Sequence, residues 1–270
     1  MKLGIIGKGF VGSAVANGFD KDCEQIIVDP KYTDNTIEDV LECKITFLCV
    51  PTPVSEDGSC DVSIAKDVLT ELDRHQYKGV VVIKSTIIPD YLHKFKKTYD
   101  LKMVYNPEFL TEANAVNDFE NQKRIILGGP KSETTKLKKI YSKVFPKAHI
   151  IKTDSKHAEM VKYLTNCFLA TKVSFANEIY QVCEKLKVDY SKVVKYAVLD
   201  ERLGKSHWNV PGPDGDLGFG GHCLPKDLSA FIHLAMKLDT ETNVLNAVEE
   251  TNDVVRKNRD WEDMKGRAVV

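Results

Sequence analysis

The sequence has little of what marks membrane, secreted or metal-binding proteins. Its apolar runs are all shorter than the roughly 20 residues that a membrane-spanning helix needs, and Met1 leads straight into a strand-like segment and not into a signal peptide. The seven cysteines are an odd number without paired or CxxC spacing, which argues against a disulfide framework and against a zinc site. We therefore expect a cytoplasmic protein with reduced thiols, no metal and no membrane partner.

Net charge is also nearly absent. The 38 lysines and arginines balance the 39 aspartates and glutamates, so no overall field attracts nucleic acid or an anionic membrane. At 270 residues, the chain is long enough for one large domain or two small ones. Small-molecule chemistry, with no nucleic-acid partner, is the favoured class of function.

Short β-branched runs alternate with polar, helix-like segments in the first half of the chain. The runs are KLGIIG, QIIVD, ITFLCV, VVVIKST, KMVYNP, RIILGG and HIIKT. This alternation predicts an α/β fold, a Rossmann-like and mostly parallel sheet covered by helices, over residues 1–153. Over residues 154–187 the apolar residues have helical spacing, and Gly and Pro are absent. This change predicts an all-helical domain over residues 154–270.

A glycine pattern points to a dinucleotide. Gly7, Gly9 and Gly12 have GxGxxG spacing directly after an apolar run. Two of these glycines would let the backbone approach a pyrophosphate at a helix N-terminus, and the third would allow close helix packing. Asp29 ends the second predicted strand, where a carboxylate would accept hydrogen bonds from a ribose and repel a 2′-phosphate. This pattern predicts that NAD binds here in preference to NADP.

Polar residues follow three further predicted strands. Thr52 lies in "CVPTP", Ser85 and Thr86 lie in "KSTIIP", and Glu108 and Glu112 lie in "NPEFLTEA". Open α/β sheets bind their ligands at the carboxyl ends of the strands, which is where these side chains are expected. Taken singly, each hydroxyl is equally well explained as a turn former. For each glutamate, a surface carboxylate is the usual interpretation.

Cys223 differs from the other six cysteines. It lies in "GFGGHCLPKD", after a segment dense in Gly and Pro and just before the helix that Pro225 is expected to begin, with Lys226 beside it. A helix N-terminus and an ammonium group both favour the thiolate, which is the nucleophilic form. The other cysteines lie in strand or helix patterns and are interpreted as small buried hydrophobes. Only Cys223 is predicted to be reactive.

Lys162 and Asn166 are four residues apart in "HAEMVKYLTNCF", so they share one face of a helix. A cation and an amide could therefore point into one site. The alternative for an arbitrary helix is a solvent-facing lysine with an exposed asparagine. His157, His222 and His233 are assigned no role, because single histidines on helices are commonly packing or surface residues.

These motifs, in this order, resemble the UDP-glucose 6-dehydrogenase family of nucleotide-sugar dehydrogenases, from residue 1 to about 265. The resemblance implies NAD-dependent, four-electron oxidation of the C6 alcohol of UDP-glucose to a carboxylate, giving UDP-glucuronate. Cys223 would capture the intermediate aldehyde as a thiohemiacetal, which the second oxidation converts to a thioester that water hydrolyses.

The resemblance also implies a role for each residue that matches a family motif. Lys162 would stabilise the oxyanion, with Asn166 and Asp227 assisting through hydrogen bonds, and Glu108 would act as an acid and base. Thr86 and Glu112 would hold water and the nicotinamide. The implied cofactor-binding residues are Gly7, Gly9, Phe10, Val11, Gly12, Asp29, Thr52, Ser85, Thr86, Glu112 and Lys226. The implied substrate-binding residues are Glu108, Phe109, Leu110, Lys162, Asn166, Arg202, Phe219 and Gly220.

Arg202 in "DERLG" matches a family arginine that reaches the substrate from the neighbouring subunit. The resemblance therefore implies a homodimer through the long helix that starts near residue 155.

The chain departs from the family at its end. Family members continue with a second nucleotide-fold domain that covers the UDP half of the substrate, whereas "MKGRAVV" matches only the start of that domain. The sequence is either a truncated piece or a natural short form that lacks this domain. Two other functions remain open: oxidation of another nucleotide sugar, GDP-mannose or a UDP-N-acetyl aminosugar, and a truncated NAD-binding module without full activity.

Overall fold

The structure is a computed structural model that describes residues 1–270. It divides into two compact units. The first comprises Met1–Thr52 and Val62–Lys162, and the second comprises Pro53–Asp61 and Tyr163–Val270. Helix α6 (Ser155–Leu186) therefore contributes its first residues to one unit and the remainder to the other.

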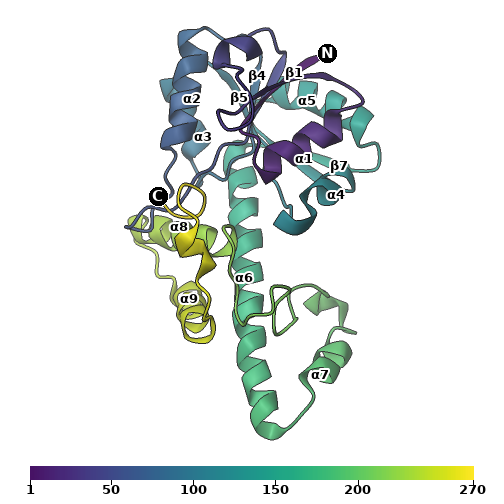
Figure 1. Cartoon of the computed structure of the whole chain (residues 1–270), viewed down its shortest axis with the longest axis vertical. Coiled ribbons are helices and arrows are strands. Elements are labelled where there is room, and N and C mark those ends of the chain that lie inside the picture. The colour runs from purple at the N-terminus through teal and green to yellow at the C-terminus, as the bar shows by residue number, and fades with distance from the viewer. The chain divides into compact units, whose positions relative to one another are not determined.

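A seven-stranded sheet forms the centre of the first unit (Figure 1). Its strands are β1 (Lys2–Ile6), β2 (Glu24–Val28), β3 (Ile45–Leu48), β4 (Val80–Ile83), β5 (Lys102–Tyr105), β6 (Arg124–Gly128) and β7 (His149–Thr153). The order is β2-β1-β3-β4-β5-β6-β7, and only the β5–β6 pair is antiparallel. Six strands lie within the predicted β-branched runs and β2 starts one residue before its run, so the prediction of a mostly parallel α/β sheet is confirmed.

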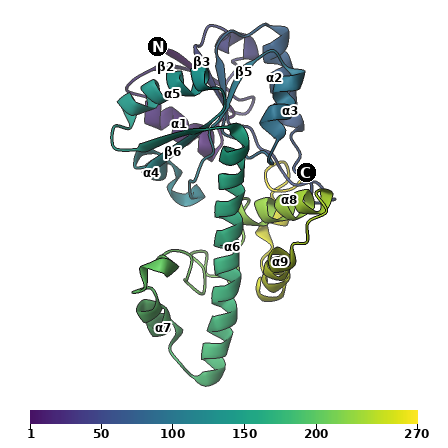
Figure 2. The same ribbon diagram turned by 180° about the vertical axis from the view of Figure 1, so that it is seen from behind.

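Helices cover both faces of this sheet. They are α1 (Phe10–Phe19), α2 (Ser63–Arg74), α3 (Tyr91–Thr98), α4 (Ala115–Glu120) and α5 (Lys131–Val144), with short 3-10 helices η1 (Ile37–Val40) and η2 (Glu112–Asn114). Helices α2 and α3 lie on one side, and α1, α4 and α5 lie on the other (Figures 1 and 2). Both faces are buried, which is why β3 and β4 consist almost entirely of apolar residues.

Aromatic packing fixes α1 against the sheet. The ring of Phe19, at the end of α1, lies 5.5 Å from Phe47 of β3 and 5.9 Å from Phe145 after α5, measured between ring centroids. Such tilted and edge-to-face pairs are each worth roughly 0.5–1.5 kcal/mol beyond the buried area. The position of α1 matters because the glycine pattern lies at its N-terminus.

The second unit is built on the remainder of α6. Its other helices are α7 (Tyr190–Ala197), η3 (Glu201–Leu203), α8 (Leu224–Lys237), α9 (Asn243–Val255) and η4 (Asp260–Asp263). Cys167 and Ala170 of α6 form a core with Leu228 of α8 and Val248 of α9. Isolated β bridges join Val54 to Cys60 and to Val269, so residues of the 53–61 segment pack in this unit. None of the helices combines the length and the apolar composition that crossing a membrane requires.

Candidate active site

The glycine loop after β1 has the backbone that a dinucleotide site needs. Gly7 has φ +91°, and a Cβ on Gly12 would lie 1.9 Å from the carbonyl oxygen of Gly7, so α1 can begin this close to the strand only with glycine there. A Cβ on Gly9 would meet nothing within 4 Å, and no side chain caps this end of α1. The N-terminus of the helix therefore faces open space beside Gly9, which fits a bound pyrophosphate.

Asp29, directly after β2, holds the glycine loop. Its Oδ2 accepts a hydrogen bond from the backbone N–H of Lys8 at 2.6 Å, and its Oδ1 accepts one from the N–H of Lys31 at 2.9 Å. A carboxylate oxygen can accept more than one hydrogen bond, so the group can still bind a ribose hydroxyl. Its place beside the loop fits the predicted cofactor role.

Asp29→Ala is expected to weaken NAD binding by about ten- to a hundredfold while the protein stays folded. A hydrogen bond to a charged group is worth about 1.5–3 kcal/mol, and the variant also frees the loop at Lys8. Calorimetric titration with NAD, together with thermal unfolding, measures both effects. Asp34→Ala, at an exposed aspartate of the same segment, is the matched control. Equal affinity in the wild type and Asp29→Ala contradicts the assignment.

The hydroxyl groups that follow β3 and β4 donate hydrogen bonds to backbone carbonyl oxygens. Thr52 Oγ1 donates to the carbonyl oxygen of Thr86 at 2.7 Å, and Ser85 Oγ donates to the carbonyl oxygen of Val50 at 2.6 Å. Both side chains are buried. These bonds tie the two strand ends together at the edge where the cofactor is expected. A direct contact of these residues with NAD stays a prediction.

Lys162 and Glu108 form a buried ion pair. Lys162 Nζ lies 2.7 Å from Glu108 Oε1 and 2.9 Å from the carbonyl oxygen of Glu108. The two side chains are only 3% and 5% exposed. Glu108 Oε2 accepts a further hydrogen bond from the N–H of Leu110 at 2.7 Å. The alternative of a solvent-facing lysine is therefore wrong, and a cation and a carboxylate that could exchange a proton lie in contact.

The segment that carries Glu108 also lines a cavity of about 440 Å³ in the first unit, with Phe109, Leu110 and Lys84. Burial lowers the pKa of Lys84 to about 8, although its Nζ donates to Asn106 Oδ1 at 3.1 Å. The guanidinium of Arg124 lies 4.2 Å from the centre of the Phe109 ring. The cavity thus offers cationic groups and an aromatic face.

Glu159 is a buried residue that the sequence reasoning missed. It lies on α6, three residues before Lys162, and is completely buried. Its two oxygens accept the backbone N–H groups of Asp90 at 2.8 Å and Leu92 at 3.0 Å, at the start of α3. Burial raises its pKa to about 7 despite these two donors. The one signal in the sequence is its spacing of about one helical turn from Lys162.

The stability of Glu159→Gln is expected to vary less with pH than that of the wild type. A folded-state pKa of about 7, above the ordinary value of 4.5 for a glutamate, means that the folded chain binds this proton more tightly than the unfolded chain. The contribution is fully present below about pH 4.5 and is lost as the pH rises through 7. Relative to Glu159→Gln, the wild type should lose up to about 3 kcal/mol of unfolding free energy between pH 5 and pH 8.

Urea unfolding of both proteins at several pH values in this range measures the difference. Glu120→Gln, at an exposed glutamate, should follow the wild type. Parallel curves for the wild type and Glu159→Gln contradict the buried, proton-binding carboxyl group.

In the second unit, Asp227 accepts two side-chain hydrogen bonds. Asn166 Nδ2 donates to its Oδ2 at 2.6 Å, and Lys226 Nζ donates to its Oδ1 at 2.5 Å. All three residues are buried. Burial by itself would lower the pKa of Lys226, but attraction by Asp227 raises it overall. The structure thus brings together three of the predicted site residues, and Asn166 is not the exposed asparagine of the alternative.

Cys223 is the N-cap of α8, with Pro225 in the first turn of the helix. Its side chain is half-buried, and attraction by Cys223 is one of the smaller causes that raise the pKa of Lys226. Burial raises the pKa of Cys49 and of Cys167 to about 12, which makes those thiols unreactive. Cys23 is also half-buried, and burial raises its pKa as well. These environments agree with Cys223 as the nucleophile, which stays a prediction.

Four further predicted residues differ in how exposed they are. The ring of Phe219 is in the core of the second unit and is not exposed. Arg202 has an 88% exposed side chain that pairs with Asp200. Glu112 is exposed at the start of η2, and Thr86 is half-buried. Their roles toward substrate and cofactor stay predictions.

Comparisons with known proteins agree with this arrangement. Two family models match the chain in order: the NAD binding domain of the UDP-glucose/GDP-mannose dehydrogenase family at residues 29–145, and the central domain of the same family at residues 156–254. UDP-glucose 6-dehydrogenase TuaD of Bacillus subtilis is 31% identical over 94% of this chain and 63% of its own length. UDP-glucose 6-dehydrogenase AglM of Haloferax volcanii is 31% identical over 94% of this chain and 70% of its own length.

Among solved structures, a UDP-glucose dehydrogenase from the archaeon Pyrobaculum islandicum matches with a TM-score of 0.85 and 26% identity, over 99% of this chain and 80% of that one. The chain spans 50% to 63% of the length of the first two curated relatives that it matches. NAD is the cofactor of the matched N-terminal domain, and the glycine loop and Asp29 fit it. Since both of its units match this family, the chain belongs to the UDP-glucose/GDP-mannose dehydrogenases.

Proposed function

We propose that the protein oxidises the C6 alcohol of UDP-glucose to a carboxylate in two steps, forming UDP-glucuronate. The observation that carries the proposal is Cys223, a half-buried thiol at the N-terminus of α8 in the same helix turn as the buried pair Lys226 and Asp227. A single alcohol-to-aldehyde step needs no nucleophile, whereas the four-electron reaction needs one to hold the aldehyde.

When bound, NAD accepts the hydride that each oxidation releases. The first oxidation removes a hydride from C6 and a proton from its hydroxyl group, which leaves an aldehyde. The thiolate of Cys223 adds to the aldehyde carbon, and the carbonyl oxygen takes up a proton to give a thiohemiacetal. Loss of a second hydride and of the hydroxyl proton gives a thioester. Water attacks this carbon, the C–S bond breaks, and the carboxylate and the thiolate of Cys223 are released while the two protons of the water pass to solvent.

The buried polar residues support these steps. The ammonium of Lys162 would stabilise the oxygen that becomes negative, and Glu108, already in contact with it, would take or return a proton. Asn166 and Asp227 would orient the reacting oxygen and a water through their hydrogen bonds. Thr86 would hold a water beside the cofactor. Because the charged groups are pre-oriented and buried, they need little reorganisation during the reaction.

The cavity lined by Glu108, Phe109 and Leu110 supports a nucleotide-sugar substrate. Lys84, Lys123 and Arg124 also line this cavity. Such cations attract the phosphates of a nucleoside diphosphate. Phe219 and Gly220 would contact the sugar. GDP-mannose is the second candidate, because the family description names it beside UDP-glucose.

The yield of NADH per nucleotide sugar tests the proposal. Two equivalents of NADH from each UDP-glucose are expected, together with UDP-glucuronate in the product mixture. One equivalent indicates a simple alcohol dehydrogenase. A higher rate with GDP-mannose or with a UDP-N-acetyl aminosugar indicates that substrate instead. No NADH with any of these sugars, in a protein that still binds NAD, indicates a non-catalytic NAD-binding module.

We further propose that the protein acts as a homodimer through α6. Its residues Leu164, Phe168, Phe175, Val182 and Leu186 are between 51% and 68% exposed. Their separations of four, seven, seven and four residues place them along one face of the helix, as in a coiled-coil seam. A large exposed apolar face on a helix favours association, and a two-fold copy of the same helix would cover it. Arg202 would then reach the substrate of the partner subunit.

Phe168→Glu is expected to weaken such a dimer by at least about a hundredfold. The change removes a large apolar side chain from the centre of this face and brings two like charges together across a two-fold contact. Sedimentation velocity at micromolar concentrations measures the result. Gln181→Glu adds the same charge at an exposed position outside the apolar seam and should remain dimeric. Unchanged association of Phe168→Glu shows that this face is not the interface.

A further inference from the structure

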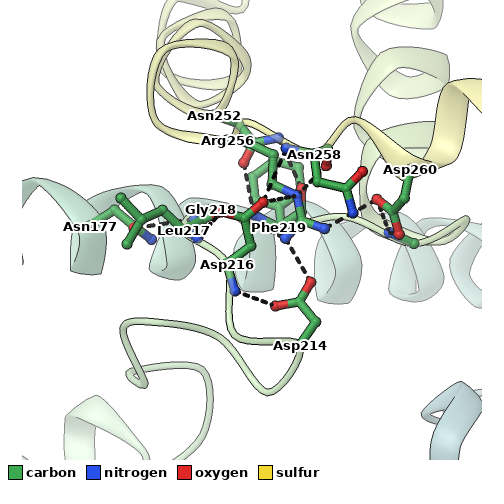
Figure 3. Close-up of polar contacts among 11 residues, drawn as sticks. Asn177, Asp214, Asp216, Leu217, Gly218, Phe219, Asn252, Arg256, Asn258 and Asp260 are labelled. Atoms are coloured by element: carbon green, nitrogen blue, oxygen red, sulfur yellow. Dashed lines mark hydrogen bonds and ion pairs between the residues drawn. The ribbon is translucent and has the colours of Figure 1, made fainter.

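Arg256 is a buried arginine in the second unit that the mechanism above does not use. It caps the end of α9, and its side chain is 1% exposed (Figure 3). Its guanidinium lies 2.7 Å from a carboxylate oxygen of Asp214 and 3.1 Å from one of Asp260, and its Nε donates to the carbonyl oxygen of Asn258 at 2.7 Å. Asp216 lies 3.7 Å from Nε. A buried guanidinium with these partners holds its surroundings in one arrangement.

Two glycines before Cys223, Gly218 and Gly220, leave room for the side chains of Asn252, Arg256 and Asp260. A Cβ on Gly220 would lie 2.2 Å from Nη2 of Arg256 and 2.3 Å from Oδ1 of Asp260. A Cβ on Gly218 would lie 2.3 Å from Oδ1 of Asn252. In the structure, protein side chains therefore occupy the space that a side chain would need at both positions. Gly221 differs, because a Cβ there would meet nothing within 4 Å.

Asn252 and Asp260 both form hydrogen bonds with the backbone around these glycines (Figure 3). Asn252 Oδ1 accepts the N–H of Phe219 at 2.7 Å, and Asn252 Nδ2 donates to the carbonyl oxygen of Phe219 at 3.0 Å. The N–H of Gly221 donates to both oxygens of Asp260, at 3.2 and 3.1 Å. Asp260 thus links the guanidinium of Arg256 to a backbone group two residues before Cys223.

We propose that Arg256, acting through Asp260, is a positioning residue that holds the Gly218–Gly221 backbone and thereby places Cys223 at the start of α8. This inference deepens the proposed function, since it explains what keeps the nucleophile in place. Gly218 then packs against Asn252, and Gly220 packs against Arg256 and Asp260. The space beside the Cα of Gly221 is open.

Two variants test the link. Arg256→Lys keeps the charge but loses the forked contacts, and Asp260→Ala removes the acceptor for the Gly221 N–H at a partly exposed position where folding should survive. Iodoacetamide alkylation of Cys223, followed on its peptide by mass spectrometry, reports on the thiol, and hydrogen exchange reports on the amides of residues 218–223. Both readouts are independent of sugar oxidation. All proteins are compared at a temperature where circular dichroism shows them folded.

In both variants, the amides of residues 218–223 should exchange faster, and the rate of Cys223 alkylation should differ from that of the wild type by about tenfold. The kcat for sugar oxidation should fall about ten- to a hundredfold, and the KM for NAD should be unchanged. Asp260→Asn, which keeps an acceptor oxygen, should recover part of kcat. Lys257→Gln removes a neighbouring exposed positive charge and should match the wild type.

Wild-type exchange and alkylation rates in Asp260→Ala overturn the inference, whether or not the protein oxidises UDP-glucose. If Arg256→Lys does not fold, Asp260→Ala decides. If the wild type makes no NADH but both variants change the reactivity of Cys223, the proposed function fails and the positioning role stands.

Discussion

Cys223→Ser is expected to lower the NADH yield from two equivalents per UDP-glucose to one at most, and to leave the sugar as an aldehyde. A serine hydroxyl stays protonated near neutral pH and adds weakly to an aldehyde, whereas a thiolate is a strong nucleophile. Without the sulfur, no thiohemiacetal holds the aldehyde for the second oxidation. The yield is measured by NADH absorbance at limiting UDP-glucose, with the sugar product identified by mass spectrometry.

Cys23→Ser is the matched control, because Cys23 is the other half-buried thiol of the chain. It should keep the full yield. Cys223→Ser should also bind NAD as the wild type does, since the glycine loop and Asp29 belong to the first unit. Two equivalents of NADH at the wild-type rate from Cys223→Ser contradict the covalent mechanism.

The strands and long helices could be predicted because their sequence patterns are local. A β-branched run between polar segments has few alternatives to a buried strand, and the absence of Gly and Pro over residues 154–187 allows one long helix. Helix α7 was not predicted. It has only eight residues, and its one buried residue, Tyr190, packs in a small cluster with residues of α6. Packing partners of this kind are not visible in local spacing.

Motifs predicted the candidate site residues, but they did not predict which residues these side chains contact. Glu108 and Lys162 are 54 residues apart, and Glu159 and the N–H of Asp90 are 69 apart. Helical spacing indicated that Lys162 and Asn166 share a face but not that both are buried. Of the two glutamates in "NPEFLTEA", the structure buries Glu108 and exposes Glu112.

In the glycine-rich segment before Cys223, too, contacts with residues far away in the sequence could not be predicted. The family resemblance implied that Phe219 and Gly220 contact the substrate, and close approach of a ligand is a usual reason for a glycine in a binding loop. The structure shows a second reason at Gly218 and Gly220, where Asn252 and Arg256 occupy the space. These partners come from α9 and its end, over 30 residues later, and their distance in the sequence hid them.

Lys162→Met is expected to destabilise the protein by about 3–5 kcal/mol, because it leaves the buried carboxylate of Glu108 without its cation. It should also lower kcat by about a hundred- to a thousandfold, if the ammonium stabilises the oxyanion. Urea unfolding measures the first effect, and steady-state NADH formation measures the second. A drop in kcat by itself does not separate the two, because a poorly folded enzyme is also slow.

The double variant Lys162→Met with Glu108→Gln separates them. Replacing both partners of a buried ion pair by neutral groups of similar size is often close to neutral for stability, so the double variant should regain most of the lost unfolding free energy. Its kcat should stay low, because neither an ammonium nor an ionisable carboxyl group remains. If stability and kcat recover together, Lys162 serves only the fold, and the reaction must draw its electrostatic stabilisation from the Asn166, Lys226 and Asp227 group instead.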